Sequence, residues 1–157
     1  MEAKPLKILI VDDNPDYRFT METFLKSNGF ETLTAEDGKM AMERIRAERP
    51  DMVLLDVMME TRFSGFEVCK KIRTDPDLEE TLIISITGMA EELGVGFDKY
   101  PDYHYFSPDE FMEKPVDKPY LLKRIREIFA ETAALKKRPK WQKDLEAEQL
   151  KKYPGTY

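Results

Sequence analysis

The chain has 157 residues, 41% of them hydrophobic, which is enough for one well-packed domain with a short extension. Its net charge of −6 at pH 7 argues against a general nucleic-acid-binding surface, and its single cysteine excludes a disulfide framework and a cysteine-based zinc site. The first residues contain no apolar signal-peptide core, and no apolar run reaches the roughly 18 residues that a membrane span needs. We therefore expect a soluble, cytoplasmic protein without a membrane span.

Short apolar runs alternate with amphipathic segments over the first half of the chain. The apolar runs predict strands at residues 6–11, 30–35, 52–55 and 81–86. The segments between them have helical periodicity and predict a helix at residues 15–28, a second that follows Asp37-Gly38 and is broken by Pro50-Asp51, and a third that begins at Phe66 and ends near Asp75-Pro76. A regular alternation of strands and helices is typical of a parallel sheet with right-handed crossovers, so the sequence predicts an α/β fold.

The pattern is less regular beyond residue 88. Glycines and a proline interrupt residues 89–106, which predicts a short, irregular fourth helix and a long loop. The only histidine, His104, lies in this aromatic loop, and we interpret it as a surface residue rather than a metal ligand or phosphodonor. Residues 110–113 predict a weak fifth strand, and residues 120–129 predict a clear amphipathic fifth helix.

The composition shifts near residue 136, where we expect the domain to end. The prediction is one domain at residues 1–135 and a tail at residues 136–157. The basic run at residues 136–140 is interpreted as a solvated linker, with an electrostatic contact to an acidic partner or a membrane surface as the alternative. For the helix-prone segment at residues 141–152, packing on the domain, a dimer contact and docking on a partner stay open.

Asp56 ends the most apolar of the predicted strands. Residues 52–55 show no alternation, which indicates a strand that is buried on both faces of a parallel sheet. Open α/β sheets bind their ligands beyond the carboxyl ends of their strands, which is where this acid lies. By itself, Asp56 is either the start of an ordinary polar loop or the reactive centre of the protein.

Polar residues also follow the other predicted strands, and together they define a site. They are Asp12 and Asp13, then Asp56, Thr87 and Lys114. In a right-handed parallel sheet these strand ends lie at one edge, so three carboxylates would repel one another unless a cation neutralised them. Oxygen ligands of this kind suit Mg²⁺, while a lysine and a hydroxyl can bind an anion. The residues therefore predict a phosphoryl site in which an aspartate is the nucleophile.

Four motifs in this order resemble the receiver domain of two-component response regulators. They are Val11-Asp12-Asp13, the run from Leu54 to Met59, Thr87-Gly88 and Lys114-Pro115. The resemblance covers about residues 5–131. It implies a flavodoxin-like, doubly wound, five-stranded parallel sheet with strand order 2-1-3-4-5 and helices on both faces.

The resemblance implies a role for each acidic residue of the site. Asp56 matches the aspartate that accepts the phosphoryl group, and Asp12 and Asp13 match the acidic pair that holds Mg²⁺, or Mn²⁺ in its place. Met58 stands where the family offers a backbone carbonyl to the metal, which Asp56 also binds. An aspartate-nucleophile phosphatase would need a second acid at this position, so the presence of Met58 argues against that class of enzyme.

The resemblance also implies the residues that bind phosphate and respond to it. Lys114 matches the phosphate-binding lysine, and its bond to Pro115 is cis in this family. Thr87 matches the switch hydroxyl, and Gly88 is the small residue that the family has next to it. Phe111 matches the aromatic switch position, although an ordinary core aromatic is an equally good interpretation.

The implied function is a stand-alone response regulator. A histidine kinase or a phosphotransfer protein would phosphorylate Asp56, and a downstream protein target would recognise the altered surface. No direct DNA binding is expected, a homodimer is possible, and the only catalysis implied is self-directed phosphoryl transfer and autodephosphorylation. The alternative is a constitutive adaptor with a receiver fold that is not phosphorylated.

Two loops depart from the family pattern. Glu60 stands where the family usually has proline, and Gly65 comes one residue late. The segment from Thr87 to Lys114 is also several residues longer than usual. Because the family's output surface includes this segment, the sequence leaves the partner open.

Overall fold

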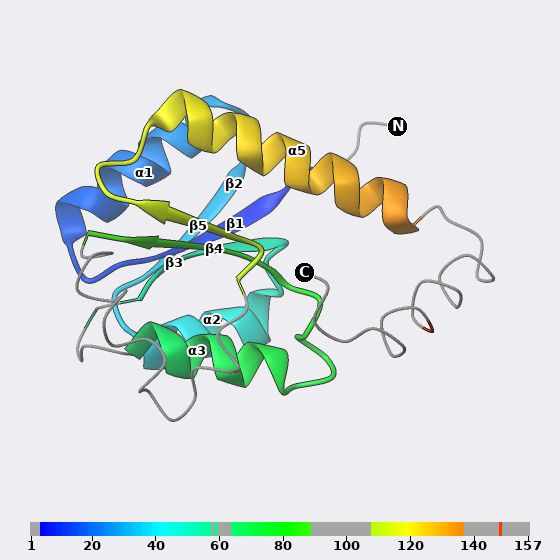
Figure 1. Cartoon of the computed structure of the whole chain (residues 1–157). Coiled ribbons are helices and arrows are strands. Elements are labelled where there is room, and N and C mark those ends of the chain that lie inside the picture. Colours follow the sequence, from blue (N-terminus) through cyan, green and yellow to red (C-terminus); the bar gives the residue numbers. More distant parts are fainter. Residues whose placement is uncertain (1–3, 58, 60–63, 89–107, 137–147, 149–157) are drawn as a thin grey trace. The chain divides into compact units, whose positions relative to one another are not determined.

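The structure is a computed structural model, and it describes residues 4–57, 59, 64–88, 108–136 and 148. For Thr87 and Lys136 it describes the backbone alone. The chain divides into two compact units, residues 1–115 and residues 116–157. The first unit contains the whole sheet and the helices α1, α2 and α3, and the second contains α5 (Figure 1).

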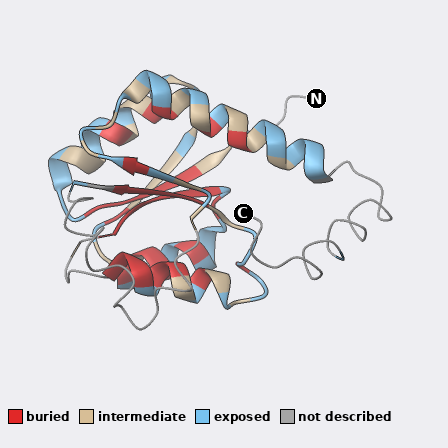
Figure 2. Ribbon diagram, viewed as in Figure 1, coloured by how far each residue is buried: buried red, intermediate tan, exposed pale blue. Residues whose placement is uncertain are grey.

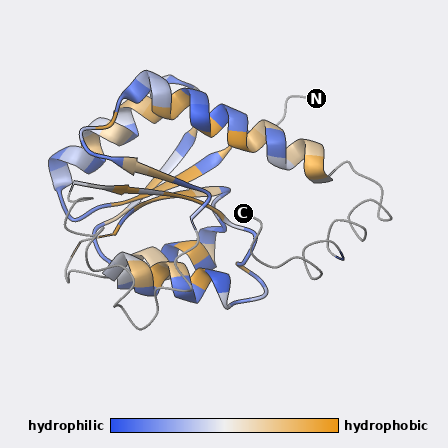
Figure 3. Ribbon diagram, in the orientation of Figure 1, coloured by the Kyte–Doolittle hydropathy of each residue, from blue (hydrophilic) through white to orange (hydrophobic). Residues whose placement is uncertain are grey.

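Five parallel strands form one sheet in the order β2-β1-β3-β4-β5, as predicted. Their bounds are β1 Lys7–Val11, β2 Glu31–Ala35, β3 Met52–Asp56, β4 Leu82–Thr87 and β5 Glu110–Glu113. Every residue of the central strand β3 is buried (Figure 2). The continuous apolar sequence of β3 fits this burial, since crossover helices cover both faces of a parallel sheet (Figure 3).

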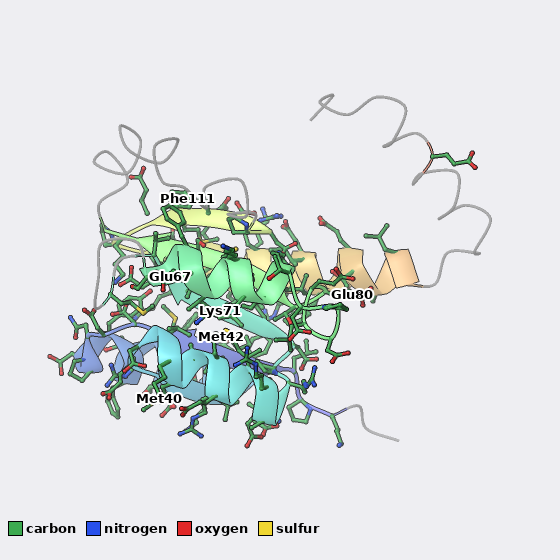
Figure 4. All side chains as sticks on the ribbon, turned by 90° about the horizontal axis from the view of Figure 1, so that it is seen from below. Met40, Met42, Glu67, Lys71, Glu80 and Phe111 are labelled. Carbon is green, nitrogen blue, oxygen red and sulfur yellow. The ribbon has the colours of Figure 1, made fainter. Side chains whose placement is uncertain are left out.

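The helices of the first unit cover both faces of the sheet, so the predicted doubly wound arrangement is confirmed (Figure 1). Helix α1, Pro15–Ser27, lies on one face. Helices α2, Gly38–Glu48, and α3, Ser64–Arg73, lie side by side on the other face (Figure 4). Each crossover returns to a parallel strand, which places the carboxyl ends of all five strands at the same edge.

Polar caps begin α1 and α2 directly after their strands. The side chain of Asn14 accepts hydrogen bonds from the backbone N–H groups of Asp16 and Tyr17, at 2.9 and 3.2 Å. Asp37 likewise accepts from the N–H of Met40 at 2.7 Å. These caps satisfy donors that have no partner inside the helix. As a result, the chain turns sharply after β1 and keeps the acidic pair close to the end of the strand.

The hydrophobic core on the α2–α3 face joins four strands to these two helices. It contains apolar side chains of β1, β2, β3 and β4 together with the inward faces of α2 and α3. Cys69 of α3 is fully buried within it, as expected for a small hydrophobic residue. Since the strand ends are anchored by this core, the side chains that follow them are held on a rigid frame.

Most predicted elements agree with the structure to within one or two residues. The largest differences are in α3, which begins at Ser64 rather than residue 66, and in α5, Lys118–Lys136, which is longer than predicted. The predicted fourth helix and the loop with His104 lie outside the described residues, as does nearly all of the tail helix. In the part of the chain that is described, no helix combines the length and apolar character required to cross a bilayer.

Candidate functional site

Two buried aspartates lie side by side at the carboxyl edge of the sheet. Asp12 follows β1 and Asp56 ends β3, and these strands are neighbours with Val11 paired to Leu55. Asp12 and Asp56 are only 1% and 6% exposed, whereas Asp13 is exposed. One carboxylate oxygen from each of the three residues lies within 4.8 Å of the others. The predicted gathering of these acids at one edge is therefore present.

Asp12 is oriented from both sides. Its Oδ1 accepts a hydrogen bond from the backbone N–H of Asn14 at 2.9 Å, so the start of α1 holds the carboxylate. The Arg18 guanidinium donates to the backbone carbonyl of Asp12 at 2.7 Å. The fixed Oδ1 leaves the second oxygen, Oδ2, to face the other charged groups of the site.

Lys114 links the two buried aspartates. Its ammonium lies 2.6 Å from Oδ2 of Asp12 and 3.5 Å from Oδ2 of Asp56. Burial by itself would lower the pKa of Lys114, but the hydrogen bond to Asp12 and the negative charge of Asp56 raise this pKa above its usual value. The bond between Lys114 and Pro115 is cis, as the family resemblance implied. The lysine therefore stays charged over Asp56 at neutral pH.

The sequence reasoning missed one side chain of this site, Tyr17. The Lys114 ammonium lies 4.3 Å from the centre of the Tyr17 ring. The phenol oxygen is buried and has no hydrogen-bond partner in the described structure. Burial, followed by the charges of Asp12 and Asp56, raises the pKa of Tyr17 above its usual value. Tyr17 lies at helical spacing from the apolar residues of α1, and this pattern does not predict a contact with Lys114.

Gly65 allows α3 to begin against the segment that follows Asp56. A side-chain Cβ on Gly65 would lie 2.4 Å from the Cα of Val57 and 2.7 Å from the carbonyl oxygen of Asp56, closer than atoms can approach. The Gly65 N–H donates to the carbonyl of Val57 at 2.8 Å, and the N–H of Met59 donates to Oγ of Ser64 at 3.1 Å. These bonds tie the loop after the acid to the first turn of α3.

The other expected site residues are placed only in part. Thr87 is the last residue of β4 and pairs with Glu113 of β5, but its side chain lies outside the described structure, as does Met58. Gly88 lies next to Lys114, because a Cβ on Gly88 would be 3.8 Å from Cδ of that lysine. Phe111 pairs with Ser85 in the sheet and is 37% exposed (Figure 4). The ends of β4 and β5 therefore meet at Lys114, while Phe111 lies at the surface.

The charges of the cluster fit one divalent cation. Three carboxylates and one ammonium leave a net charge of −2, concentrated where two of the acids have almost no contact with water. The side-chain atoms of the cluster that could bind a metal are all carboxylate oxygens, which are the preferred ligands of Mg²⁺ and Ca²⁺. Mg²⁺ in particular is held by one or two carboxylates together with water and phosphate oxygens. The arrangement can bind such a cation and, beside it, an anionic group.

The fold and this acidic edge define a receiver of the two-component signalling class. Residues 8–126 match the response regulator receiver domain family, and the chain belongs to that family. The recognition made from the four motifs is therefore confirmed.

Particular relatives agree with this assignment. The chain is 34% identical to the response regulator MprA of Mycolicibacterium vanbaalenii over 82% of its own length and 52% of MprA. It is 32% identical to ycf27 of Cyanophora paradoxa, which is named a transcriptional regulator, over 84% of its own length and 52% of that protein. Among solved structures, the chemotaxis response regulator CheY4 of Vibrio cholerae is 27% identical, with a TM-score of 0.66 over 79% of this chain and 98% of CheY4. The chain spans about half the length of these curated relatives.

Proposed function

We propose that this chain is a phospho-accepting receiver in which Asp56 takes a phosphoryl group from a histidine kinase or a phosphotransfer protein. The observation that carries the proposal is the grouping of the Asp56 carboxylate with those of Asp12 and Asp13 and with the Lys114 ammonium, which lies 3.5 Å from its Oδ2. A carboxylate in this group has acids that can hold a cation and an ammonium that can hold an anion close to it. Membership of the receiver family supports the same role.

The acidic residues would hold the metal. Asp12, Asp13 and Asp56 are the ligands that we assign to Mg²⁺, or to Mn²⁺, together with the backbone carbonyl of Met58. When it is bound, the cation neutralises negative charge on the phosphoryl oxygens. The bond from the Asn14 N–H holds one oxygen of Asp12, so that the other oxygen keeps its direction while the site is loaded.

The transfer step that we assign to Asp56 is a displacement at phosphorus. One carboxylate oxygen of Asp56 forms a bond to phosphorus as the bond from phosphorus to the donor histidine nitrogen breaks. The leaving imidazole keeps the bonding electrons and takes a proton from water. Lys114 offers its ammonium to a phosphoryl oxygen, and because its pKa is raised, it needs no change of protonation to do so.

Phosphorylation would then change a protein-binding surface. We assign the switch to Thr87 and Phe111, in which the Thr87 hydroxyl turns to the phosphoryl group and the exposed Phe111 side chain moves inward. Such a change is a shift between two populations that the phosphoryl contacts favour unequally. The only catalysis in this proposal is the transfer to Asp56 and its later hydrolysis.

The organisation of the chain around the receiver is part of the proposal. We assign residues 1–135 to the receiver and residues 136–157 to a tail, with a protein as the downstream target and no direct contact with DNA; a homodimer stays open. One relative is named a transcriptional regulator, and the relatives are about twice as long. The cytoplasmic location is proposed on the same family grounds.

Intact-mass measurement tests the central claim. With Mg²⁺ and a small phosphodonor such as acetyl phosphate, the wild-type chain should gain the mass of one phosphoryl group. The Asp56→Asn variant should gain none, because an amide cannot form the acyl phosphate. Asp77→Asn is the matched control, since it makes the same change at an exposed aspartate in the loop after α3.

Three outcomes separate the candidate functions. No mass gain in the wild-type chain, under conditions in which Mg²⁺ binding is measured independently, would contradict the phospho-receiver and favour the constitutive adaptor. A gain that persists in Asp56→Asn would place the phosphoryl group on another residue. Burst hydrolysis of an added phosphoester would favour an enzyme.

A further inference from the structure

The ring of Tyr17 forms one wall of the Lys114 site. The ammonium of Lys114 lies 4.3 Å from the ring centre, a distance at which a cation is attracted to the negative face of an aromatic ring. The first turn of α1 places the ring, because the side chain of Asn14 accepts a hydrogen bond from the Tyr17 N–H at 3.2 Å. The contact therefore joins the start of α1 to the residue that follows β5.

The ring differs from the two other contacts of this ammonium in the described structure. Those contacts are the carboxylates of Asp12 and Asp56, at 2.6 and 3.5 Å. In the proposed function both carboxylates change: Asp12 shares its charge with a cation, and Asp56 becomes an acyl phosphate without a carboxylate charge. The aromatic face is the contact that neither event alters.

We propose that Tyr17 is a positioning residue that holds the Lys114 ammonium above Asp56 while the lysine exchanges its carboxylate partners for a phosphoryl oxygen. This inference rests on the proposed function, because the exchange occurs only if Asp56 receives a phosphoryl group. A lysine side chain has a flexible four-carbon stem, and ordering it costs conformational entropy. A ring that holds the ammonium in both states lowers the cost of ordering the lysine when the anion arrives.

Two kinds of variant isolate the ring. Tyr17→Phe removes the hydroxyl and keeps the aromatic face, whereas Tyr17→Leu keeps an apolar side chain and removes the face. Tyr17→Met is a second variant without a ring, available if the leucine variant does not fold. A structural role in packing α1 would respond to side-chain size, so the leucine and methionine variants would lose stability but keep the wild-type affinity for a phosphoryl mimic.

The first measurement concerns the contact itself and needs no phosphoryl group. In a lysine-labelled protein, the methylene protons of Lys114 next to its ammonium should resonate upfield, because they lie over the face of an aromatic ring. Lys114→Arg identifies the signal. The upfield shift should persist in Tyr17→Phe and disappear in Tyr17→Leu and Tyr17→Met. Its absence in the wild-type chain, or its persistence in the variants without a ring, would overturn the proposal.

The second measurement is the affinity for beryllofluoride, a phosphoryl mimic, in the presence of Mg²⁺. Because the ring contacts the ammonium in both states, its removal acts on the Kd through the cost of ordering the lysine side chain, which corresponds to a change of about threefold to tenfold in a binding constant. We expect the Kd of Tyr17→Leu to rise by that factor and the Kd of Tyr17→Phe to stay within about twofold of wild type. Equal affinities in wild type and folded Tyr17→Leu would contradict the positioning role of Tyr17 and leave the proposed function standing. If the wild-type chain bound no beryllofluoride, the proposed function would fail, and the role of Tyr17 with it.

Discussion

At the residue scale, the buried hydroxyl of Tyr17 lowers stability in the resting state. It has no hydrogen-bond partner in the described structure, and burying a hydroxyl without a partner costs about 1–3 kcal/mol. We therefore predict that Tyr17→Phe raises the free energy of unfolding at neutral pH by about 1 kcal/mol. Urea denaturation of both proteins measures the difference, and a variant less stable than wild type would indicate that the hydroxyl has a partner after all.

The same residue makes stability depend on alkaline pH. Burial and the charges of Asp12 and Asp56 raise the pKa of Tyr17, so the folded chain keeps this proton at pH values where the unfolded chain loses it. The contribution is fully present below the unfolded pKa, about 10, and is lost as the pH rises toward the folded pKa. The free energy of unfolding should therefore fall above about pH 10, and fall less steeply in Tyr17→Phe. The pKa of Lys114 is also raised, so this lysine lowers the free energy of unfolding at alkaline pH in wild type and in Tyr17→Phe alike.

Gly65 is a residue whose replacement should affect both folding and the site. The nearest backbone atom would be 2.4 Å from an added Cβ, so Gly65→Ala forces α3 away from the segment after Asp56. Strain of this kind costs about 1–3 kcal/mol, and we predict a loss of stability in that range together with slower phosphorylation of Asp56. Calorimetry and the rate of mass gain test the two parts. The control is Ala47→Gly at an exposed position of α2, which should lower stability by less and leave the phosphorylation rate unchanged.

The acidic cluster could be predicted from sequence, whereas its aromatic wall could not. Asp12 and Asp56 each end a strongly apolar run, and parallel topology alone then brings them to the same edge. Tyr17 meets Lys114 only because α1 begins immediately after the acidic pair and β5 ends close to it. The contact between Tyr17 and Lys114 depends on how α1 and β5 are arranged in space. The position of Tyr17 among the apolar residues of α1 does not predict this arrangement.

At the element scale, Arg73 joins the end of α3 to the starts of two strands. Its guanidinium donates to the backbone carbonyls of Glu79 and Thr81 and to the carboxylate of Asp109, at 2.7, 2.7 and 3.0 Å. Asp109 also accepts from the N–H of Ile83 at 2.8 Å. The group fixes the entry to β5, and β5 carries Phe111 and leads to Lys114.

Replacing Arg73 should therefore loosen β4 and β5 together. We predict that Arg73→Ala lowers the free energy of unfolding by about 2 kcal/mol, and that Arg73→Lys recovers only part of it, because an ammonium cannot reproduce the planar fork of donors. Arg44→Ala, at an exposed position of α2, should change stability by less than about 0.5 kcal/mol. Amide hydrogen exchange should be faster in β4 and β5 of Arg73→Ala; a uniform increase across the sheet would contradict this local role.

The elements themselves follow from patterns that the sequence shows directly. Apolar runs predicted the strands and helical periodicity predicted α1 and α2, since these patterns act over a few residues. The start of α3 differs because it depends on the approach of Gly65 to Val57, a contact between backbone atoms across a loop. The Arg73–Asp109 pair likewise joins residues that no periodicity relates.

At the scale of the whole molecule, the site lowers the stability of a chain that already carries a net charge of −6. Lys114 offsets one of the three carboxylate charges of the cluster, which leaves a net charge of −2 there. A cation that binds the folded chain and not the unfolded chain stabilises the fold by mass action. At a concentration one hundred times its Kd, this stabilisation is about 2.7 kcal/mol.

We therefore predict that Mg²⁺ raises the free energy of unfolding of the wild-type chain by about 2–3 kcal/mol near saturation, measured by urea denaturation at constant ionic strength. Asp13→Asn removes one charge from the exposed member of the cluster, so it should be slightly more stable than wild type without the metal and gain much less from it. Asp77→Asn, which changes the same charge away from the site, should gain as much from Mg²⁺ as wild type does. If Asp13→Asn and Asp77→Asn responded equally to Mg²⁺, the stabilisation would come from general screening of the negative chain, and the assignment of the metal to this edge of the sheet would be wrong.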